Sequence, residues 1–403
     1  MFKNIYISQL FTGISFIVSF FLLFITTYYL SVEERGIFGL IYTLPSLLVT
    51  LTDFGIAPIL IRYISKNEDS NKILASIFTL HIIRVFVIIF IAFIIIFIFN
   101  DYLFKIPSIY LYLGLPVAFS LSANSYLSPY FFGSNKIIKY YLFLLFPNFV
   151  VLIFCVVLLL LDQYDLINII ILSASVYFIH SIYLTYYFWD YAAIKKFKVY
   201  KIFYNLLNES KFLYFSNILN YGFVYIFPIF LNYSFGLVTL SYVLFCIAIA
   251  DKLLLVGDSV GYEIIRRINV ETDKLNFHKK QKYFSKVVLY VTPVLILSAI
   301  LIFLFTKFVL LEYWFQKYLP VLEFLYLVIY SFIFQGLIRL YQQFYNGLGD
   351  TKFTFLIILF GFIFKTICLF LANESITNIY LCFLIIDFII LTFIVMKTHL
   401  NHE

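Results

Sequence analysis

Residues 73–99 read ILASIFTLHIIRVFVIIFIAFIIIFIF, an apolar run that contains a single charged side chain, Arg84. A helix of about 20 apolar residues, rising about 1.5 Å per residue, crosses a hydrocarbon layer ~30 Å thick. This run is longer than that and has no polar face for water. We therefore interpret residues 73–99 as a membrane-spanning helix.

Comparable runs recur from one end of the chain to the other. Hydrophobic residues make up 64% of the 403, and charged residues only 12%, whereas soluble domains have roughly 45–50% and about 25%. These values predict an all-α membrane protein with about twelve transmembrane helices and no soluble domain. The predicted spans are 9–30, 37–61, 73–99, 108–133, 138–161, 167–189, 212–234, 237–262, 285–309, 319–347, 353–371 and 376–396.

The distribution of lysine and arginine predicts the orientation. If the N-terminus lies in the cytoplasm, twenty of the 28 basic residues fall in or at the ends of cytoplasmic segments, and four lie within spans. Only four, Arg35, Lys105, Lys307 and Lys317, lie outside. Basic residues favour the cytoplasmic side, so we expect both termini to be inside. The net charge of +7 then reflects topology and contact with anionic lipid headgroups, and nucleic acid is not an expected partner.

The chain divides into two halves that carry matching landmarks. We expect two pseudo-symmetric six-helix lobes, 1–190 and 212–403, joined by a basic, amphipathic cytoplasmic linker at 191–211 that lies in the membrane interface. Parallel repeats of this kind place a substrate site between them near the midplane, which favours a transporter. The landmarks recur at offsets of 200 to 216: Gly36 and Gly236, Asp53–Arg62 and Asp258–Arg267, Gly133–Lys136 and Gly349–Lys352.

Several short motifs resemble one family of membrane transporters. Residues 31–40 (SVEERGIFGL), 53–57 (DFGIA) and 60–65 (LIRYIS) are similar to the opening of polysaccharide-biosynthesis flippases, and residues 206–217 are similar to the start of that family's second half. This O-antigen-type family belongs to the multidrug/oligosaccharidyl-lipid/polysaccharide exporter superfamily. The resemblance implies a bacterial cytoplasmic-membrane protein that moves a polyprenyl-(pyro)phosphate-linked oligosaccharide to the outer leaflet by alternating access, for surface polysaccharide assembly.

Four basic residues deep in predicted spans are the candidates for binding an anionic substrate head. Arg84 lies roughly 16 Å into its span, Lys252 and Lys365 roughly 16–18 Å from the cytoplasmic ends of theirs, and Arg339 roughly 12 Å. An ionisable group at such depth costs about 2.5–3.5 kcal/mol and normally faces a cavity or a partner. Cations there would attract the phosphate. The other interpretation is that Arg84 and Lys252 pair with Asp53, Asp251 or Asp387 to hold helices together, and that Arg339 snorkels toward the interface.

Polar side chains at helical spacing are candidates for a pathway that binds sugar hydroxyls. Ser331, Gln335, Arg339, Gln342 and Asn346 share one face of the tenth span, and lipid would not tolerate such a stripe. Interhelical hydrogen bonds are the other explanation. Two amides of the seventh span, Asn217 and Asn220, could contribute in the same way.

Four carboxylates are candidates for ion coupling during the return step, through H⁺ or Na⁺: Asp53, Asp251, Asp258 and Asp387. The five histidines have no metal-ligand spacing, and neither a phosphate loop nor a nucleophile motif occurs, so we expect no metal, no cofactor and no enzymatic activity. The expected partners are the lipid-linked oligosaccharide, membrane lipids and other polysaccharide-assembly membrane proteins.

Two rival functions fit the same sequence. A multidrug or toxin extruder would share the fold, but its substrates are often cationic, so deep carboxylates should then outnumber deep cations. An integral-membrane polymerase or glycosyltransferase would need larger outer loops or an Asp-x-Asp pair, and the sequence has neither. The sugar, the coupling ion and the oligomeric state have no signature in the sequence.

Overall fold

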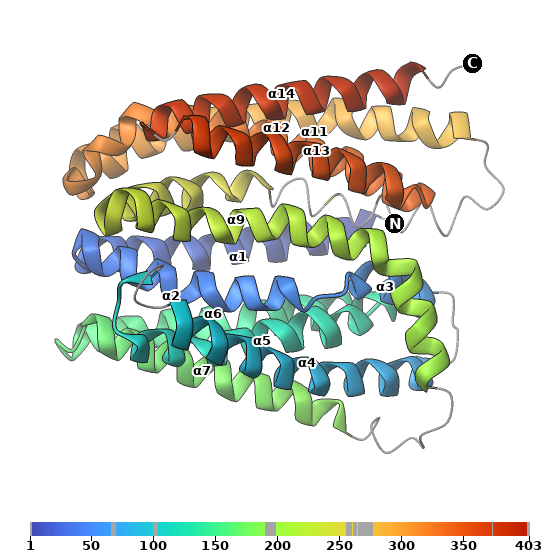
Figure 1. Ribbon diagram of the computed structural model, residues 1–403, viewed down its shortest axis with the longest axis horizontal. Helices are drawn as coiled ribbons and strands as arrows, with labels where there is room; N and C mark the ends of the chain where they lie inside the picture. The colour runs from blue at the N-terminus through green and yellow to red at the C-terminus, as the bar shows by residue number, and fades with distance from the viewer. Residues whose placement is uncertain are drawn as a thin grey trace. The chain divides into compact units, whose positions relative to one another are not determined.

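The computed structural model describes residues 2–65, 70–99, 104–189, 199–254, 260, 264, 277–372 and 374–400. Every regular element in this part of the chain is a helix, which confirms the predicted all-α class (Figure 1). The chain forms two compact units, which are described separately. The first unit is Gly13–Ser241, and the second is Met1–Thr12 with Tyr242–Glu403. The predicted lobes, 1–190 and 212–403, stay a prediction.

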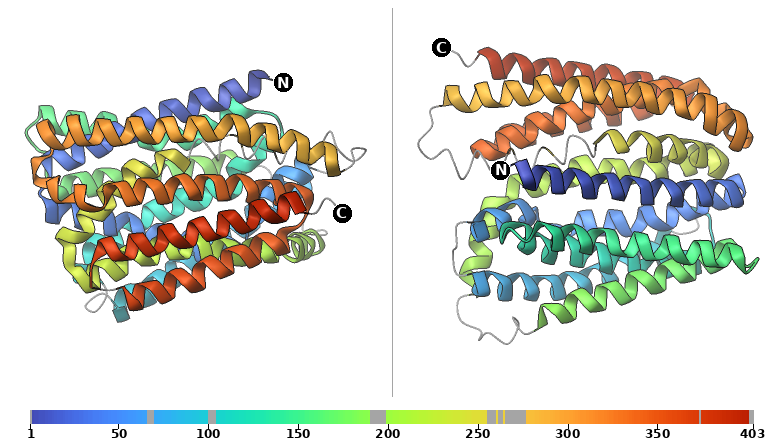
Figure 2. Two further views of the ribbon diagram at one scale, coloured as in Figure 1. Left: turned by 90° about the horizontal axis from the view of Figure 1, so that it is seen from above. Right: turned by 180° about the vertical axis from the view of Figure 1, so that it is seen from behind.

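The first unit is organised around α5 (Ser108–Gly133), which packs against five neighbouring helices (Figure 2). Small residues on α5 permit close approach: a Cβ atom added to Gly114 would lie 2.7 Å from the Ile41 carbonyl oxygen. The other helices of this unit are α1 (Phe2–Tyr29, from Gly13 on), α2 (Val32–Leu51), α3 (Ile56–Ser65), α4 (Ser70–Phe99), α6 (Ile137–Leu160), α7 (Leu166–Tyr187) and α9 (Val199–Ala250, up to Ser241).

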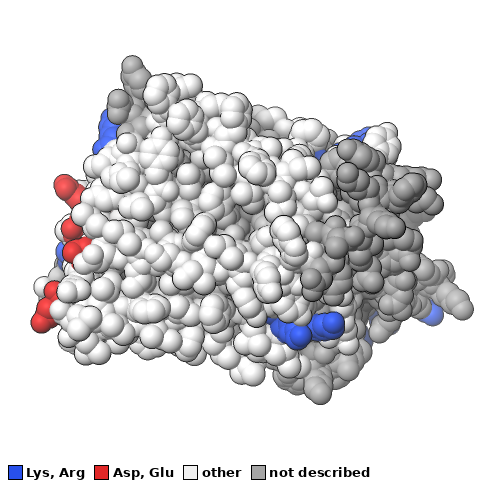
Figure 3. Space-filling view, turned by 90° about the horizontal axis from the view of Figure 1, so that it is seen from below, with Lys and Arg blue, Asp and Glu red and all other residues white. Residues whose placement is uncertain are grey.

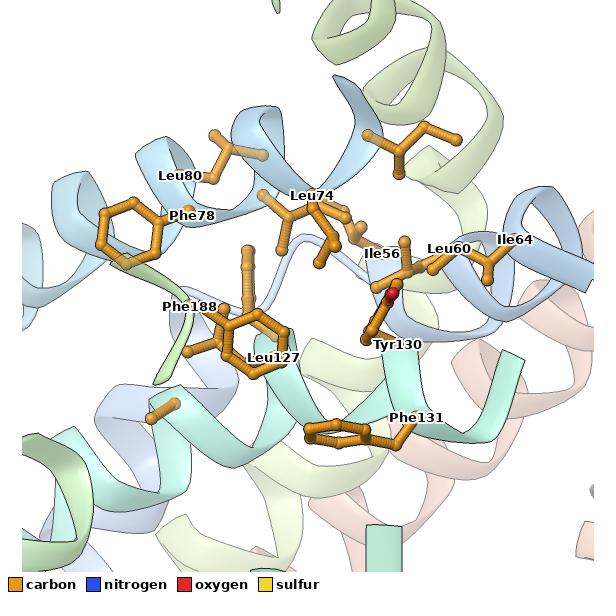
Figure 4. Packing of buried hydrophobic residues seen from close by; sticks show 14 of the residues in the cluster. Ile56, Leu60, Ile64, Leu74, Phe78, Leu80, Leu127, Tyr130, Phe131 and Phe188 are labelled. Carbon is orange, nitrogen blue, oxygen red and sulfur yellow. The ribbon is translucent and has the colours of Figure 1, made fainter. Parts of the chain in front are cut away.

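Apolar side chains fill the space between α3, α4 and α5. Figure 4 shows Leu60 of α3, Leu74 and Phe78 of α4, and Phe131 of α5 converging on one another. Leu60 and Phe131 are fully buried. This core joins α3 to the first half of α4 and to α5, and Arg84 lies one to two turns farther along α4.

The predicted second span is broken in its middle. α2 ends at Leu51, α3 begins at Ile56, and the turn between them holds Phe54 and Gly55 in the left-handed region, at φ 47° and 63°. A Cβ atom on Gly55 would lie 2.7 Å from the backbone nitrogen of Tyr214. Two independent reasons therefore require glycine at this position: the positive φ angle and the close approach of α9.

The first arm of α9 begins within the predicted linker. Residues 199–211 are helical, and Figures 1 and 2 show these turns crossing the end of the first unit at which α3 lies. The Tyr63 hydroxyl donates to Glu209 Oε1 at 2.6 Å, and farther along the Asn232 amide donates to the Phe104 carbonyl at 2.8 Å. The rest of the predicted linker, 190–198, lies outside the described residues.

Gly236 breaks α9 at φ 82° and ψ 175°, with helix on both sides. The sequence predicted two spans here, 212–234 and 237–262, separated by a short loop. The chain instead passes from one helical arm to the next through a single residue, because glycine adopts this angle without steric cost.

The second unit is built around α12 (Leu322–Leu348), which packs against α11, α13 and α14. Its core includes the fully buried aromatic side chains of Phe245, Phe315 and Tyr318, and the stacked rings of Phe284 and Phe344, 4.3 Å apart. Its helical segments are the end of α9 from Tyr242, α11 (Phe277–Phe305), a π-helical segment (Thr306–Trp314), a 3₁₀ segment (Gln316–Val321), α12, α13 (Thr351–Leu371) and α14 (Ile376–Leu400).

One predicted landmark of duplication falls at a turn between two helices in both units, but the two turns differ in detail. The α5–α6 turn has its left-handed residue at Asn135, at φ 59°, the third position of the landmark, and the α12–α13 turn has it at Gly349, at φ 86°, the first position. Gly36 differs from Gly236 because it lies inside a helix, α2. The Asp258–Arg267 landmark lies outside the described residues, and duplication stays a prediction.

Nine helices of the described residues are long and apolar enough to cross a membrane. On α4, Phe86 and Phe97 are 68% and 76% exposed, which suits lipid and not water. Figure 3 shows a broad uncharged surface with acidic side chains gathered at one end. The predicted spans 37–61 and 108–133 correspond to the broken α2–α3 and to the more polar α5, which are not among the nine. The number twelve and the orientation stay predictions.

Candidate functional site

Arg84 of α4 is fully buried in the first unit and holds the α2–α3 turn. Its Nε donates to Thr52 Oγ1 at 2.9 Å, its Nη1 donates to Ser125 Oγ at 2.6 Å, and its Nη2 donates to the Val49 carbonyl. Asp53 Oδ1 lies 3.6 Å from Nη2. The carbonyl of Val49 loses its helical partner where α2 ends, so the guanidinium satisfies the end of a helix and a carboxylate together.

Asp53 is the partly exposed member of this network. Its Oδ2 accepts a hydrogen bond from Asn217 Nδ2, on α9, at 3.1 Å. The hydroxyl of Tyr126 donates to the Asp53 carbonyl at 3.1 Å, and the ring of Tyr126 lies 4.4 Å from the guanidinium carbon. Tyr214 of α9 donates to the Leu51 carbonyl at 2.9 Å. The turn therefore ties α2, α4, α5 and α9 together.

A buried histidine lies next to this network. His81 precedes Arg84 by three residues on α4, so both face the same side of the helix. The ring nitrogens of His81 lie 3.3 Å from Ser122 Oγ and 3.3 Å from Thr185 Oγ1. The sequence analysis did not select His81, Tyr126 or Tyr214. For His81 the signal was available, since it shares a face with Arg84.

A second buried ion pair joins α13 to α14. Lys365 Nζ donates to Asp387 Oδ1 at 2.6 Å, and their side chains are 14% and 2% exposed. The other carboxylate oxygen, Oδ2, accepts from Ser331 Oγ at 2.8 Å and from Gln335 Nε2 at 3.1 Å, both on α12. The Phe383 ring centroid is 5.6 Å from Nζ. All of these groups belong to the second unit.

A third group of charges lies at the end of α9 in the second unit. Lys252 Nζ is 3.1 Å from Asp251 Oδ1, and the Asp251 side chain is 43% exposed. The positive charge of Arg339, on α12, also acts on this carboxylate. Two cations therefore act on one carboxylate, whose Oδ1 is buried although the side chain as a whole is partly exposed. Asp258 lies outside the described residues.

The polar stripe on α12 divides between two environments. Ser331 and Gln335 bind Asp387, as interhelical hydrogen bonding predicts. One to three turns further, Arg339, Gln342 and Asn346 are partly buried. Within the described part of the chain, the buried Oδ1 of Asn346 accepts no hydrogen bond. Asn220, on α9 of the first unit, is also partly buried.

The deep cations thus occur in separate ion-pair groups, each with its own carboxylate. The pairing that the sequence offered as the second interpretation is present at Arg84, and Lys252 pairs with Asp251, its neighbour in the chain. Lys365, for which the sequence offered no such pairing, is also paired. In the described residues no group of three His, Cys, Asp or Glu side chains could hold a metal ion.

A family model described as polysaccharide biosynthesis protein matches residues 1–242, which is more than half of the chain. The chain belongs to the polysaccharide biosynthesis protein family. This confirms the resemblance that the short motifs indicated. No curated protein sequence matches the chain.

Solved structures show the fold of this polysaccharide biosynthesis protein. An outward-facing multidrug resistance MATE family transporter of the MOP superfamily superposes with a TM-score of 0.65 at 11% identity, over 99% of this chain and 95% of that one. A MOP superfamily transporter from Pyrococcus furiosus, for which a binding pocket of reversed polarity suggests a different function, gives 0.65 at 9%, over 99% and 94%. The ligand-bound MATE multidrug transporter DinF-BH gives 0.67 at 12%, over 98% and 93%.

Likeness at these identities concerns the fold alone. It gives this family member the fold of those solved structures, and nine helices of the described residues are long and apolar enough to cross a membrane.

Proposed function

We propose that the protein moves a polyprenyl-(pyro)phosphate-linked oligosaccharide from the cytoplasmic to the outer leaflet of the bacterial cytoplasmic membrane by alternating access. The observation that carries this proposal is the polysaccharide biosynthesis family match over residues 1–242. The transporter fold supports the mode of action, because a glycan too polar for lipid needs a protected path.

The substrate phosphate binds, in this proposal, at Lys252 and Arg339. Both cations act on Asp251, whose side chain is 43% exposed, so in this proposal an anion can approach the group. The two positive charges exceed the single negative charge of Asp251, and the excess attracts the phosphate. Arg84 is more deeply enclosed, with a side chain that is 0% exposed. Lys365 is as enclosed as Lys252, at 14% against 15%, but its partner Asp387 is 2% exposed, whereas Asp251 is 43% exposed. We assign them positioning roles, Arg84 at the α2–α3 turn and Lys365 between α13 and α14.

Amide groups near Arg339 supply contacts to sugar hydroxyls. Gln342 and Asn346 follow Arg339 at intervals of three and four, on the same helix face. The unpartnered Asn346 Oδ1 is an acceptor that a hydroxyl can satisfy. Asn217 and Asn220 have lesser roles in this proposal, because Asn217 donates to Asp53.

Ion coupling is assigned to Asp53 and Asp251, whose side chains are 18% and 43% exposed. Each is held beside a cation and still reachable by H⁺ or Na⁺. Asp387 is 2% exposed and already paired with Lys365, and Asp258 stays a candidate from the sequence alone.

The test uses a strain that depends on this gene for its surface polysaccharide. Complementation with Lys252→Ala or Arg339→Ala should lower surface polysaccharide about tenfold or more, since a charge-assisted hydrogen bond contributes about 1.5–3 kcal/mol. The lipid-linked precursor should accumulate on the cytoplasmic side while membrane protein levels stay normal. Lys307→Ala, a basic residue on the exposed π-helical segment, is the matched control and should complement fully. Normal polysaccharide in the Lys252→Ala, Arg339→Ala double variant would refute the assignment.

The rival function is a multidrug extruder, which the deep carboxylates Asp53 and Asp251 favour. Efflux of a cationic dye from cells that express the protein separates the two. We expect no efflux above that of empty cells, whereas dye efflux that Asp53→Asn abolishes, with polysaccharide unchanged by gene deletion, would replace the flippase proposal.

A further inference from the structure

The second unit contains a carboxylate, that of Asp387, which is buried in protein and out of contact with water. Asp387 is 2% exposed, and it lies eleven residues into α14, roughly 16 Å from the helix start and so near the middle of a membrane-spanning helix. An unpaired charge at that depth costs about 2.5–3.5 kcal/mol or more. Either a cation or a proton must therefore neutralise this carboxylate, and the structure places the Lys365 ammonium against it.

The groups around Asp387 form a cradle of oxygen ligands. Its own two oxygens point at different partners, and Ser331 Oγ lies 2.8 Å from Oδ2. The Gln335 amide is 3.0 Å from Ser331 Oγ and 3.1 Å from Oδ2, and a turn of the amide would present Oε1 in place of Nε2. Carboxylate, hydroxyl and amide oxygens are the ligands that hard cations take.

The cation in this cradle is supplied by the chain itself. Lys365 enters from α13 and places its ammonium 2.6 Å from Asp387 Oδ1. On its other side the ammonium faces the Phe383 ring, at 5.6 Å, a surface that attracts cations. The ammonium thus contacts groups of α14, and the α12 groups Ser331 and Gln335 contact the other oxygen of the same carboxylate.

We propose that the Ser331–Gln335–Asp387 cradle is a monovalent-cation site whose resident cation is the Lys365 ammonium. A free Na⁺ therefore does not bind there while Lys365 is in place. The second unit keeps its buried carboxylate neutralised without drawing on a cation gradient. Ion coupling, where it occurs, falls to the more exposed carboxylates. The inference goes beyond the proposed substrate and does not depend on it.

The cradle has a direct test, because removing the ammonium should make it bind metal. Lys365→Met keeps the length of the side chain and removes its charge. Thermal unfolding of purified protein is measured in NaCl and in choline chloride at equal ionic strength. The wild type should unfold at the same temperature in both. Lys365→Met should unfold at lower temperature in choline and gain roughly 2–4 °C with Na⁺, in a saturable manner.

Three further variants make the result specific. Lys365→Met combined with Asp387→Asn should lose the response to Na⁺, since the cradle no longer carries a negative charge. Lys365→Arg retains a cation and should show no response. Lys307→Met removes an exposed charge as the matched control and should behave as the wild type.

Several outcomes overturn the inference. The inference is wrong if Na⁺ does not raise the unfolding temperature of Lys365→Met, or if acidification raises it and Na⁺ does not. It is also wrong if Na⁺ raises the unfolding temperature of the wild type and Asp387→Asn removes that effect. This last measurement remains decisive if Lys365→Met does not fold. Because the readout is unfolding temperature, failure here leaves the polysaccharide assay unaffected, and failure of that assay leaves the cradle unaffected.

Discussion

At the scale of single residues, Arg84 stabilises the first unit more than its place in an apolar helix suggests. Replacing it by Met leaves Asp53 without its cation and removes the donor to the Thr52 and Ser125 hydroxyls and one donor to the Val49 carbonyl. Breaking a buried ion pair on one side costs about 3–5 kcal/mol. We expect Arg84→Met to lower the unfolding temperature well below that of Arg339→Met, a less buried arginine and the matched control.

The same network allows a sharper version of this prediction. Adding Asp53→Asn to Arg84→Met should recover part of the lost stability, because the stranded charge is removed. Arg84→Lys should fall between wild type and Arg84→Met, since an ammonium lacks the planar fork that reaches three acceptors. Equal unfolding temperatures for Arg84→Met and wild type would show that the ion pair does not hold the turn.

The charged members of these networks could be predicted from the sequence, but their neutral partners could not. The cost of an ionisable group in lipid marks Arg84, Lys365, Asp53 and Asp387 in any apolar run, and it also predicts that they find partners. Which partner each one finds depends on helix packing. The assignment of Asp53 to Arg84 and of Asp387 to Lys365 therefore required coordinates. Tyr126 and Thr52 carry no signal, because hydroxyl groups are common throughout the chain.

At the scale of helices and turns, Gly55 should be intolerant of any side chain. Alanine at φ 63° costs about 1–2 kcal/mol, and its Cβ would also lie 2.7 Å from the Tyr214 backbone nitrogen. Gly55→Ala should therefore lower the unfolding temperature and loosen the contact between α9 and the turn. The matched control is Gly222→Ala, on α9, where nothing lies within 4 Å of the added atom. That change should be neutral or stabilising by up to about 1 kcal/mol. A larger loss at Gly222 than at Gly55 would contradict this account.

Helix existence followed from apolar periodicity, but the break between α2 and α3 did not. The sequence placed Asp53 in the middle of a continuous span, 37–61, because nothing in the hydropathy of residues 51–56 marks a turn. The structure ends α2 there, since Arg84 and Tyr126 satisfy the backbone groups that a broken helix exposes. The break at Gly236, by contrast, was predicted: it falls between the expected spans 212–234 and 237–262, and one glycine angle takes the place of a short loop.

At the scale of the whole molecule, the orientation in the membrane is the remaining expectation, and α6 offers a matched pair of sites for it. Its ends lie roughly 35 Å apart, enough to reach both surfaces. Exposed Lys136 precedes it and exposed Gln163 follows it. With the N-terminus inside, a membrane-impermeant thiol reagent applied to intact cells should label Gln163→Cys. Lys136→Cys should react only after the cells are opened. The wild type, with Cys155 and Cys246 buried, gives the background. Labelling in the reverse order would invert the topology, and with it the leaflet from which Lys252 and Arg339 receive a phosphate.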